Sequence, residues 1–307
     1  MKTVKDFNFK NKKAIIRVDF NVPLNANFEV TDATRIQAAK PTIIEILEQG
    51  GSCVLMSHLG RPKGFQEAFS LRHIVKSIEA IIGCNVKFIA DCIGEKVEEA
   101  VANLEAGEIL LLENLRFYEE EKKGEIAFAE KLSKFGDIYV NDAFGTAHRA
   151  HASTTIIAQF FEGNKCFGNL LAREIESIDK VLNNSEKPVL AILGGAKVSS
   201  KITVIENILD KVDHLIIGGG MSFTFVKALG GKIGNSICED DKMELALDIL
   251  KQAKAKGVEI HIPVDVIAAD DFSNDANTQI LDINEIPDGW EGVDAGPKSR
   301  EIFDTVV

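Results

Sequence analysis

The sequence lacks the features of several large protein classes. No apolar run approaches the ~18 residues that span a bilayer, and the N-terminal segment MKTVKDFNFKNKK has cations but not the apolar stretch of a secretory signal. The five cysteines are scattered, with no CxxC pair and no zinc-like spacing. Neither GxxxxGK[ST] nor GxGxxG occurs. We therefore expect a cytoplasmic chain with no disulfide framework and no P-loop.

An excess of positive charge is also missing. The formal net charge is −12, and no basic face or aromatic-basic stripe balances it, which disfavours a nucleic-acid partner. Hydrophobic residues make up 45% of the chain and charged residues 27%, values typical of an ordinary globular protein. A length of 307 residues exceeds what one core usually supports, so two domains are expected.

Short apolar runs alternate with segments of helical periodicity in the first half. The predicted strands are 14–20, 52–57, 86–89, 108–112 and 137–140, and the predicted helices are 41–48, 71–82, 94–103 and 126–133. Strands that are hydrophobic on both faces are typical of parallel sheets covered by helices on each side. The pattern predicts an α/β fold with a doubly wound, Rossmann-like parallel sheet.

The alternation breaks at FFEGNKCF, residues 160–167, which we expect to be irregular. Leu171, Ile175, Ile178 and Leu182 then form one apolar face of a helix. A second β-α series follows, with strands at 189–193, 214–217 and 259–262 and helices at 224–229 and 242–256. We predict a domain at 1–167, a hinge helix at 168–184 and a second, incomplete doubly wound domain at 185–307.

Arginine, of which there are eight, concentrates where predicted strands end or turn: Arg35, Arg61, Arg116 and Arg149. Guanidinium groups fit phosphate and carboxylate oxygens, and strand ends are where α/β sheets bind ligands. Because the surface as a whole repels anions, these cations predict a multiply anionic ligand. His58 and Arg61 in SHLGRPKG, a turn shaped by Gly60, Pro62 and Gly64, favour the same interpretation.

Two further segments, RVDFNVP and LLENLRF, leave alternatives open. In RVDFNVP, Asp19 either pairs with Arg17 or contacts a ligand, whereas Asn21 at the strand exit suits a ligand hydroxyl or carboxylate. Arg116 in LLENLRF could be neutralised by Glu113. In NDAFGTAHRAHAS, the histidines at 148 and 151 have no third ligand at matching spacing and flank an arginine, so we reject a metal site there.

The second half has glycines after strands. In VLAILGGAKVSSKI, Gly194 and Gly195 precede a predicted helix on which Lys197 and Lys201 would share one face, which favours a phosphate at the helix N-terminus. In HLIIGGGMSFTF, glycines 218–220 let a flat ligand approach the backbone. Solvated lysines are the alternative explanation of the first segment.

Taken together, RVDFNVP, SHLGRPKG, LLENLRF, FGTAHRAH, LGGAKVSSK, GGGMSFTF and VDAGPKS resemble the phosphoglycerate kinase family along the whole chain. The resemblance implies a monomeric, glycolytic two-domain kinase. It transfers a phosphoryl group between 1,3-bisphosphoglycerate and ADP with Mg²⁺, by domain closure and Arg/Lys charge neutralisation. It also implies 3-phosphoglycerate contacts at Asp19, Asn21, Arg35, His58, Arg61, Arg116 and Arg149. Catalytic roles fall to Arg35, Lys197 and Lys201, and nucleotide contacts to Gly195, Lys197, Lys201, Gly218, Gly219 and Gly292.

Two departures accompany the resemblance. Ser200 stands where the family usually has an acid, with little expected consequence. The family's later segments, including the metal-holding carboxylate, would follow Val307. We therefore expect half a nucleotide site, and an inactive fragment is one of the alternatives. A Rossmann dehydrogenase is disfavoured by the missing GxGxxG motif. A non-catalytic anion-binding module remains the other alternative.

Overall fold

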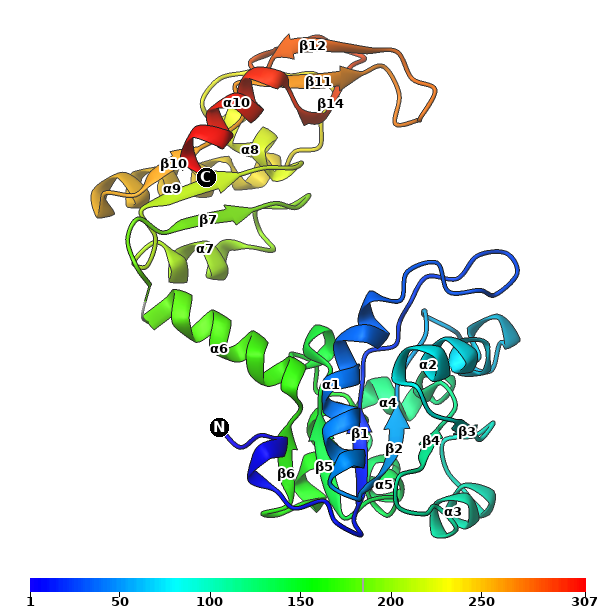
Figure 1. Ribbon diagram of the computed structural model, residues 1–307. Coiled ribbons are helices and arrows are strands. Elements are labelled where there is room, and N and C mark those ends of the chain that lie inside the picture. The colour runs from blue at the N-terminus through cyan, green and yellow to red at the C-terminus, as the bar shows by residue number, and fades with distance from the viewer. Residues whose placement is uncertain (184) are drawn as a thin grey trace. The chain divides into compact units, whose positions relative to one another are not determined.

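The computed structural model describes residues 1–183 and 185–307. The chain divides into two units, Met1–Ser177 and Ile178–Val307. The first unit contains one six-stranded, entirely parallel sheet in the order β3-β4-β2-β1-β5-β6 (Figure 1). Its strands are β1 (Lys13–Arg17), β2 (Ser52–Met56), β3 (Val86–Phe88), β4 (Ile109–Leu111), β5 (Ile138–Asn141) and β6 (Lys165–Phe167). Its helices are α1 (Thr34–Glu48), α2 (Val75–Ile82), α3 (Glu95–Ala102), α4 (Glu119–Lys123), α5 (Ile126–Ser133) and the start of α6 (Asn169–Asn183).

Both faces of this sheet are buried, as its continuous apolar strands predict. Ile16 of β1 packs in one core cluster with Ile43 of α1 and Ile78 of α2. Its neighbour Ile15 packs on the opposite face with residues of α3 and α5. Because strand side chains alternate between faces, helices on each side are required to cover them. The doubly wound fold predicted for this half is confirmed.

The second unit holds a smaller parallel sheet, β10-β8-β7, and a three-stranded antiparallel sheet, β12-β11-β14, that the sequence did not predict. Its strands are β7 (Leu190–Leu193), β8 (His214–Ile217), β9 (Lys232–Ile233), β10 (Glu259–His261), β11 (Asp265–Ala269), β12 (Thr278–Asp282), β13 (Glu285–Ile286) and β14 (Glu291–Ala295). Its helices are α7 (Ile202–Ile208), α8 (Met221–Ala228), α9 (Met243–Lys256) and α10 (Pro297–Val306). Leu215 and Ile217 of β8 pack in one core with α7, α8 and α9.

Three local predictions were wrong. Helix α1 begins at Thr34 rather than at Pro41, which lies inside it. Proline removes one helical hydrogen bond. The helix continues on both sides of Pro41 because Ile36, Ile43 and Ile46 form one buried face that packs in the core. Residues 160–167 are not wholly irregular, since β6 pairs with β5 there.

The third error concerns the segment after β7. It forms a turn in which the Lys201 backbone N–H donates to the Val198 carbonyl at 2.8 Å and the Ser200 hydroxyl donates to the Lys197 carbonyl at 2.8 Å. Helix α7 starts only at Ile202, so Lys197 and Lys201 do not share a helical face. The predicted placement of these two lysines on one helical face is therefore wrong.

Candidate functional site

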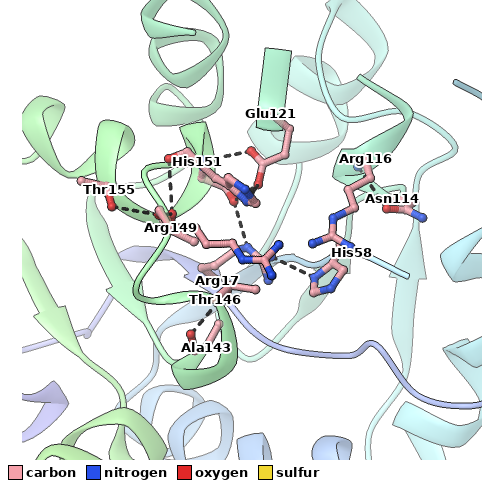
Figure 2. Close-up of polar contacts among 12 residues, drawn as sticks. Arg17, His58, Asn114, Arg116, Glu121, Ala143, Thr146, Arg149, His151 and Thr155 are labelled. Atoms are coloured by element: carbon pink, nitrogen blue, oxygen red, sulfur yellow. Dashed lines mark hydrogen bonds and ion pairs between the residues drawn. The ribbon is translucent and has the colours of Figure 1, made fainter. Parts of the chain in front are cut away.

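Polar side chains from the end of β1 and from the loops after β2, β4 and β5 gather at the carboxyl edge of the sheet of the first unit (Figure 2). In this sheet, β1 lies between β2 and β5. The chain order reverses at β1, which makes this edge a topological switch point, the usual ligand position in open α/β sheets. The predicted residues from these loops are therefore brought to one edge.

Arg17, the last residue of β1, is fully buried and anchors the cluster from below. Its Nε donates to the Ser153 hydroxyl at 2.8 Å, and its other nitrogens contact the Val18 carbonyl oxygen and His58 Nδ1, the latter at 3.0 Å. Ser153 in turn donates through its hydroxyl (2.6 Å) and its backbone N–H (3.0 Å) to the carboxylate of Glu121, which is also buried. The buried guanidinium is thus linked to a buried carboxylate through one serine.

His58 is kept neutral by its burial and by its contact with Arg17. Arginine has no acceptor, so the contact with Arg17 requires an unprotonated Nδ1 and puts the ring proton on Nε2. Burial, reinforced by the charges of Arg17, Arg116 and Arg35, lowers the pKa of His58 to about 2. The imidazole therefore serves as a fixed hydrogen-bond donor rather than as a cation.

Asp19 pairs with Arg35, so the pair with Arg17 that the sequence left open as an alternative is wrong. Arg35 Nη1 lies 2.7 Å from Asp19 Oδ2, and the Arg35 side chain is 49% exposed. Arg35 lies in the first turn of α1 rather than at a strand end, so its predicted position was wrong. The pair joins α1 to the loop after β1, and the guanidinium remains reachable from solvent.

Asn21 and Arg116 are tied to the same loop. The Gly60 backbone N–H donates to Asn21 Oδ1 at 2.7 Å, and Arg116 Nη1 donates to the Gly60 carbonyl at 2.7 Å. Glu113 does not neutralise Arg116 as the alternative suggested, because its carboxylate accepts hydrogen bonds from Ser70 and from the Leu71 and Asn114 backbone N–H groups.

The remaining arginines, Arg61 and Arg149, are exposed. Burial lowers the pKa of Arg116, and the charges of Arg17, Arg149 and Arg61 lower it further. The Glu121 carboxylate opposes this lowering, and the guanidinium groups remain cationic because arginine does not deprotonate in proteins. The cluster therefore presents several positive charges to any anion at this edge.

The histidines of the loop after β5 contribute differently. Arg149 Nε lies 3.3 Å from His148 Nε2, whereas His151 is buried with its Nδ1 3.9 Å from Glu121. Burial lowers the pKa of His151, an effect that the Glu121 carboxylate opposes and Arg116 and Arg149 reinforce. Among the described residues these two histidines belong to no group of three possible metal ligands.

In the second unit, the loops that follow β7 and β8 lie against each other. The Met221 N–H donates to the Gly195 carbonyl at 2.7 Å, and a Cβ at Gly219, whose φ is +67°, would come 3.0 Å from the Gly195 nitrogen. Gly195 itself has a φ of +149°, and its open side faces Lys201, whose Cε would lie 3.8 Å from a Cβ there. Glycine is required here by both backbone conformation and close approach.

Glu239 is a member of this site that sequence reasoning missed. Its carboxylate accepts from the Ser199 hydroxyl at 2.5 Å and from the Ser199 N–H at 2.9 Å. These two hydrogen bonds, followed by the charge of Lys197, lower the pKa of Glu239. Glu239 therefore fixes the turn that holds both lysines, and no local pattern in its sequence marks this role.

Gly218 and Gly292 complete the predicted set. The Gly218 N–H donates to the Leu193 carbonyl of β7 at 2.8 Å. Gly292 lies in β14, where a Cβ would clash with the Phe223 ring at 2.2 Å, and its N–H donates to Ser236 at 2.9 Å. Ile237, next to Ser236 in the chain, lies against Gly220, so Gly292 connects to the glycine loops through one short segment.

Ser153 and Glu121 were also missed as site residues. A lone arginine in the apolar strand AIIRV signals that a buried partner must exist, but the partner's position 104 residues or more away is set by the fold alone.

An α/β fold of two Rossmann-like units, with arginine and lysine side chains in loops that follow its strands, is typical of a phosphotransferase. The comparisons agree with this class. The phosphoglycerate kinase family model matches residues 4–307. Phosphoglycerate kinase of Porphyromonas gingivalis is 50% identical, covering 99% of this chain and 79% of that protein. The cytosolic phosphoglycerate kinase of Nicotiana tabacum is 48% identical, with 99% and 76% covered.

Solved structures lead to the same family. Phosphoglycerate kinase from Coxiella burnetii has a TM-score of 0.80 at 37% identity, with 99% of this chain and 76% of that chain covered. The enzyme from Pyrococcus horikoshii has a TM-score of 0.84 at 28% identity, with 100% and 78% covered. The chain belongs to the phosphoglycerate kinase family, a family of glycolytic phosphotransferases. Among the described residues, no helix combines the length and apolar character needed to cross a membrane.

Proposed function

We propose that this chain transfers a phosphoryl group between 1,3-bisphosphoglycerate and ADP, giving 3-phosphoglycerate and ATP. The observation that supports this most strongly is the gathering of arginine side chains around a neutral His58 at the carboxyl edge of the six-stranded sheet. A ligand with a phosphate at one end and a carboxylate at the other matches several separate guanidinium groups. The predicted domain at 1–167 is the substrate half of this proposal.

Each predicted contact has a distinct part in substrate binding. Arg61, Arg116 and Arg149 hold the anionic ends, and His58 donates from Nε2. Asn21 has its carbonyl oxygen engaged by Gly60, so its amide nitrogen is the group offered to substrate. Asp19 accepts from the substrate hydroxyl when Arg35 turns away from it, an exchange that the 49% exposure of Arg35 allows.

The nucleotide half of the proposal is the predicted domain at 185–307. Gly195, Gly218 and Gly219 leave the backbone bare for a flat ligand, and Gly292 keeps the neighbouring strand close. Lys197 and Lys201 neutralise phosphate oxygens from a turn rather than from a helix face, as point charges on flexible stems.

Phosphoryl transfer needs positioning and charge neutralisation more than covalent help. We assign these roles to Arg35, Lys197 and Lys201. The two halves must close on each other to exclude water during transfer, and the hinge for this closure is the segment 168–184, of which residue 184 lies outside the described residues. Arg35 is the cation suited to move with the transferring phosphoryl group, because it is held by an exposed ion pair with Asp19.

Mg²⁺ accompanies the nucleotide in this proposal. The lysines and backbone N–H groups at the glycine loops suit phosphate oxygens rather than a cation, so the metal would be held mainly through the phosphates themselves. Bound in that way it would neutralise phosphate charge. The protein would work as a monomer in the cytoplasm on small-molecule substrates, without nucleic-acid or membrane partners.

Substrate binding is tested by calorimetry with 3-phosphoglycerate. Arg149→Ala and Arg61→Ala should each weaken binding at least about tenfold, the cost of one charge-assisted contact. Arg72→Ala is the matched control, since this arginine is also exposed and lies over the Phe88 ring. Equal affinity in all three variants would contradict the assigned substrate site.

Catalysis is tested by a coupled assay with ATP and 3-phosphoglycerate. Arg35→Ala should reduce kcat more than it raises KM, because its contact strengthens in the transition state. Lys201→Ala should reduce turnover, whereas Lys211→Ala, the same change in the turn after α7, should not. Binding of 3-phosphoglycerate without turnover in the unaltered chain would make it a binding module instead.

A further inference from the structure

A group of three possible metal ligands lies in the second unit, outside the proposed nucleotide loops. It consists of His214, Glu259 and His261, whose ligand atoms all lie within 4.8 Å of one another. His214 and Glu259 are the first residues of β8 and β10 and are register partners, while His261 lies two positions further along β10. Because side chains alternate along a strand, all three project from the same face of the parallel sheet.

Two of the three distances between these atoms match a tetrahedral metal site, and the third, between Glu259 and His261, is within 4.8 Å. His214 Nδ1 lies 3.2 Å from His261 Nε2 and 3.4 Å from Glu259 Oε2. Ligands 2.0–2.1 Å from a tetrahedral Zn²⁺ are separated from one another by about 3.3 Å. We propose that these residues bind one divalent transition-metal ion of the Zn²⁺ class, with imidazole and carboxylate donors that such ions prefer.

The surroundings leave room for such an ion and for a fourth ligand. The three side chains line a cavity of about 550 Å³ together with Leu190 and residues of α10. The opposite face of the sheet is the one that packs in the core with α7, α8 and α9. His214 and His261 are half-buried and held on strands, so little ordering of the chain is needed to bring their nitrogens together.

The position of the site indicates its consequence. β10 is an edge strand of the sheet β10-β8-β7, and the ion would tie it to β8. An ion that binds the folded state raises stability by mass action. His214 and Glu259 start their strands, whereas the glycine loops follow the strands' carboxyl ends, so this inference does not depend on the proposed function.

The proposal is tested by measuring zinc binding to the full chain in nucleotide-free buffer, through competition with a chromophoric chelator. We expect one ion per chain with micromolar or tighter affinity, a rise in the melting temperature reported by Trp290, and an intense tetrahedral spectrum with Co²⁺. His214→Asn and His261→Asn should each lose at least about tenfold in affinity, the loss seen even for outer-shell partners. His73→Asn, a histidine change in the first unit beside Glu67, should bind as the unaltered protein does.

Glu259→Gln provides a variant that leaves the fold intact, because this side chain is 67% exposed. It should weaken zinc binding while leaving the circular dichroism spectrum and the kinase activity unchanged. Zinc affinity that is the same in His214→Asn, His261→Asn and Glu259→Gln as in the unaltered protein would overturn the proposal. So would an affinity weaker than micromolar, or a Co²⁺ spectrum of octahedral type.

Discussion

Replacing His58 by asparagine should make the first unit less sensitive to acid. In the folded chain Nδ1 accepts from Arg17, and burial beside three arginines keeps the pKa of His58 at about 2. In the unfolded chain the pKa returns to 6.5. Below that value the unfolded state binds a proton that the folded state cannot bind, so stability is present above pH 6.5 and is lost as the pH falls.

The size of the effect follows from the difference between these two pKa values. Between about pH 7 and pH 5, a group protonated only in the unfolded state removes about 2 kcal/mol of stability. This figure requires only that the folded pKa lies well below 5, and it is a sizeable share of the roughly 5–15 kcal/mol that stabilises a typical domain. Asparagine offers Oδ1 as an acceptor to Arg17 but has no titrating proton.

Urea unfolding at the two pH values measures the difference. Both tyrosines, Tyr118 and Tyr139, lie in the first unit, and the single tryptophan, Trp290, lies in the second. Near-ultraviolet circular dichroism of tyrosine therefore follows the first unit, and tryptophan fluorescence follows the second. We expect the free energy of unfolding of the first unit to fall about 2 kcal/mol less in His58→Asn than in the unaltered protein.

The comparison uses the change with pH, so any uniform loss of stability in the variant cancels. His73→Asn controls for the loss of one histidine elsewhere in the same unit. Equal pH slopes for His58→Asn and the unaltered protein would refute the reasoning. A His58 ring resonance that titrates near pH 6 in the folded protein would refute it directly.

Three further substitutions, with Ser177→Ala as a control for the first, test the packing beneath and beside the sites. Ser153→Ala leaves Arg17 and Glu121 without their shared hydroxyl, and should cost about 2–3 kcal/mol of unfolding free energy in urea titrations. Ser177→Ala, which removes an exposed hydroxyl of α6, should change it by less than about 0.5 kcal/mol. Gly60→Ala would place a Cβ 2.3 Å from the Phe69 ring at a φ of +61°, so calorimetry should detect weaker 3-phosphoglycerate binding and no change in ADP binding. Gly219→Ala should do the reverse; if it left ADP affinity unaltered, the role assigned to the glycine loops would fail.

The sheet of the first unit could be predicted because its strands are buried on both faces. A run such as AIIRV has no alternation to misinterpret, and parallel strands bring their carboxyl ends to one edge. That rule alone collects His58, Arg116 and Arg149 at one edge, although they are far apart in the sequence. The direction in which each side chain points at that edge is set by its hydrogen-bond partners and not by the strand pattern.

The partners themselves could not be predicted. Arg17 and Asp19 are two apart, and their pairing was one of two alternatives, yet Arg17 contacts the buried Ser153 while Asp19 pairs with Arg35. The β1 strand stops at Arg17, so the alternation that would have put both residues on one side does not continue to Asp19.

The lysines of the second unit show the same limit. A spacing of four predicts a shared helical face only if the helix is present, and here Ser199, held by Glu239, keeps the backbone in a turn. The apolar residues Val198, Ile205 and Leu209 are buried as the helical pattern requires. Burial alone does not distinguish a helix from a turn that precedes one.

The cations of the first unit differ in how firmly they are held, and in the proposed mechanism this difference separates binding from transfer. Arg17 has its nitrogens engaged by buried partners and supports His58, whereas Arg116 is fixed to the Gly60 carbonyl and can present its charge without reorganisation when substrate arrives. Arg35 is held by one exposed ion pair, an interaction worth about 0–1 kcal/mol. A developing negative charge on a transferring phosphoryl group can therefore attract Arg35 away from Asp19 at little cost, and the same exchange frees Asp19 to accept a hydrogen bond. An arginine buried as Arg17 is could not make that movement.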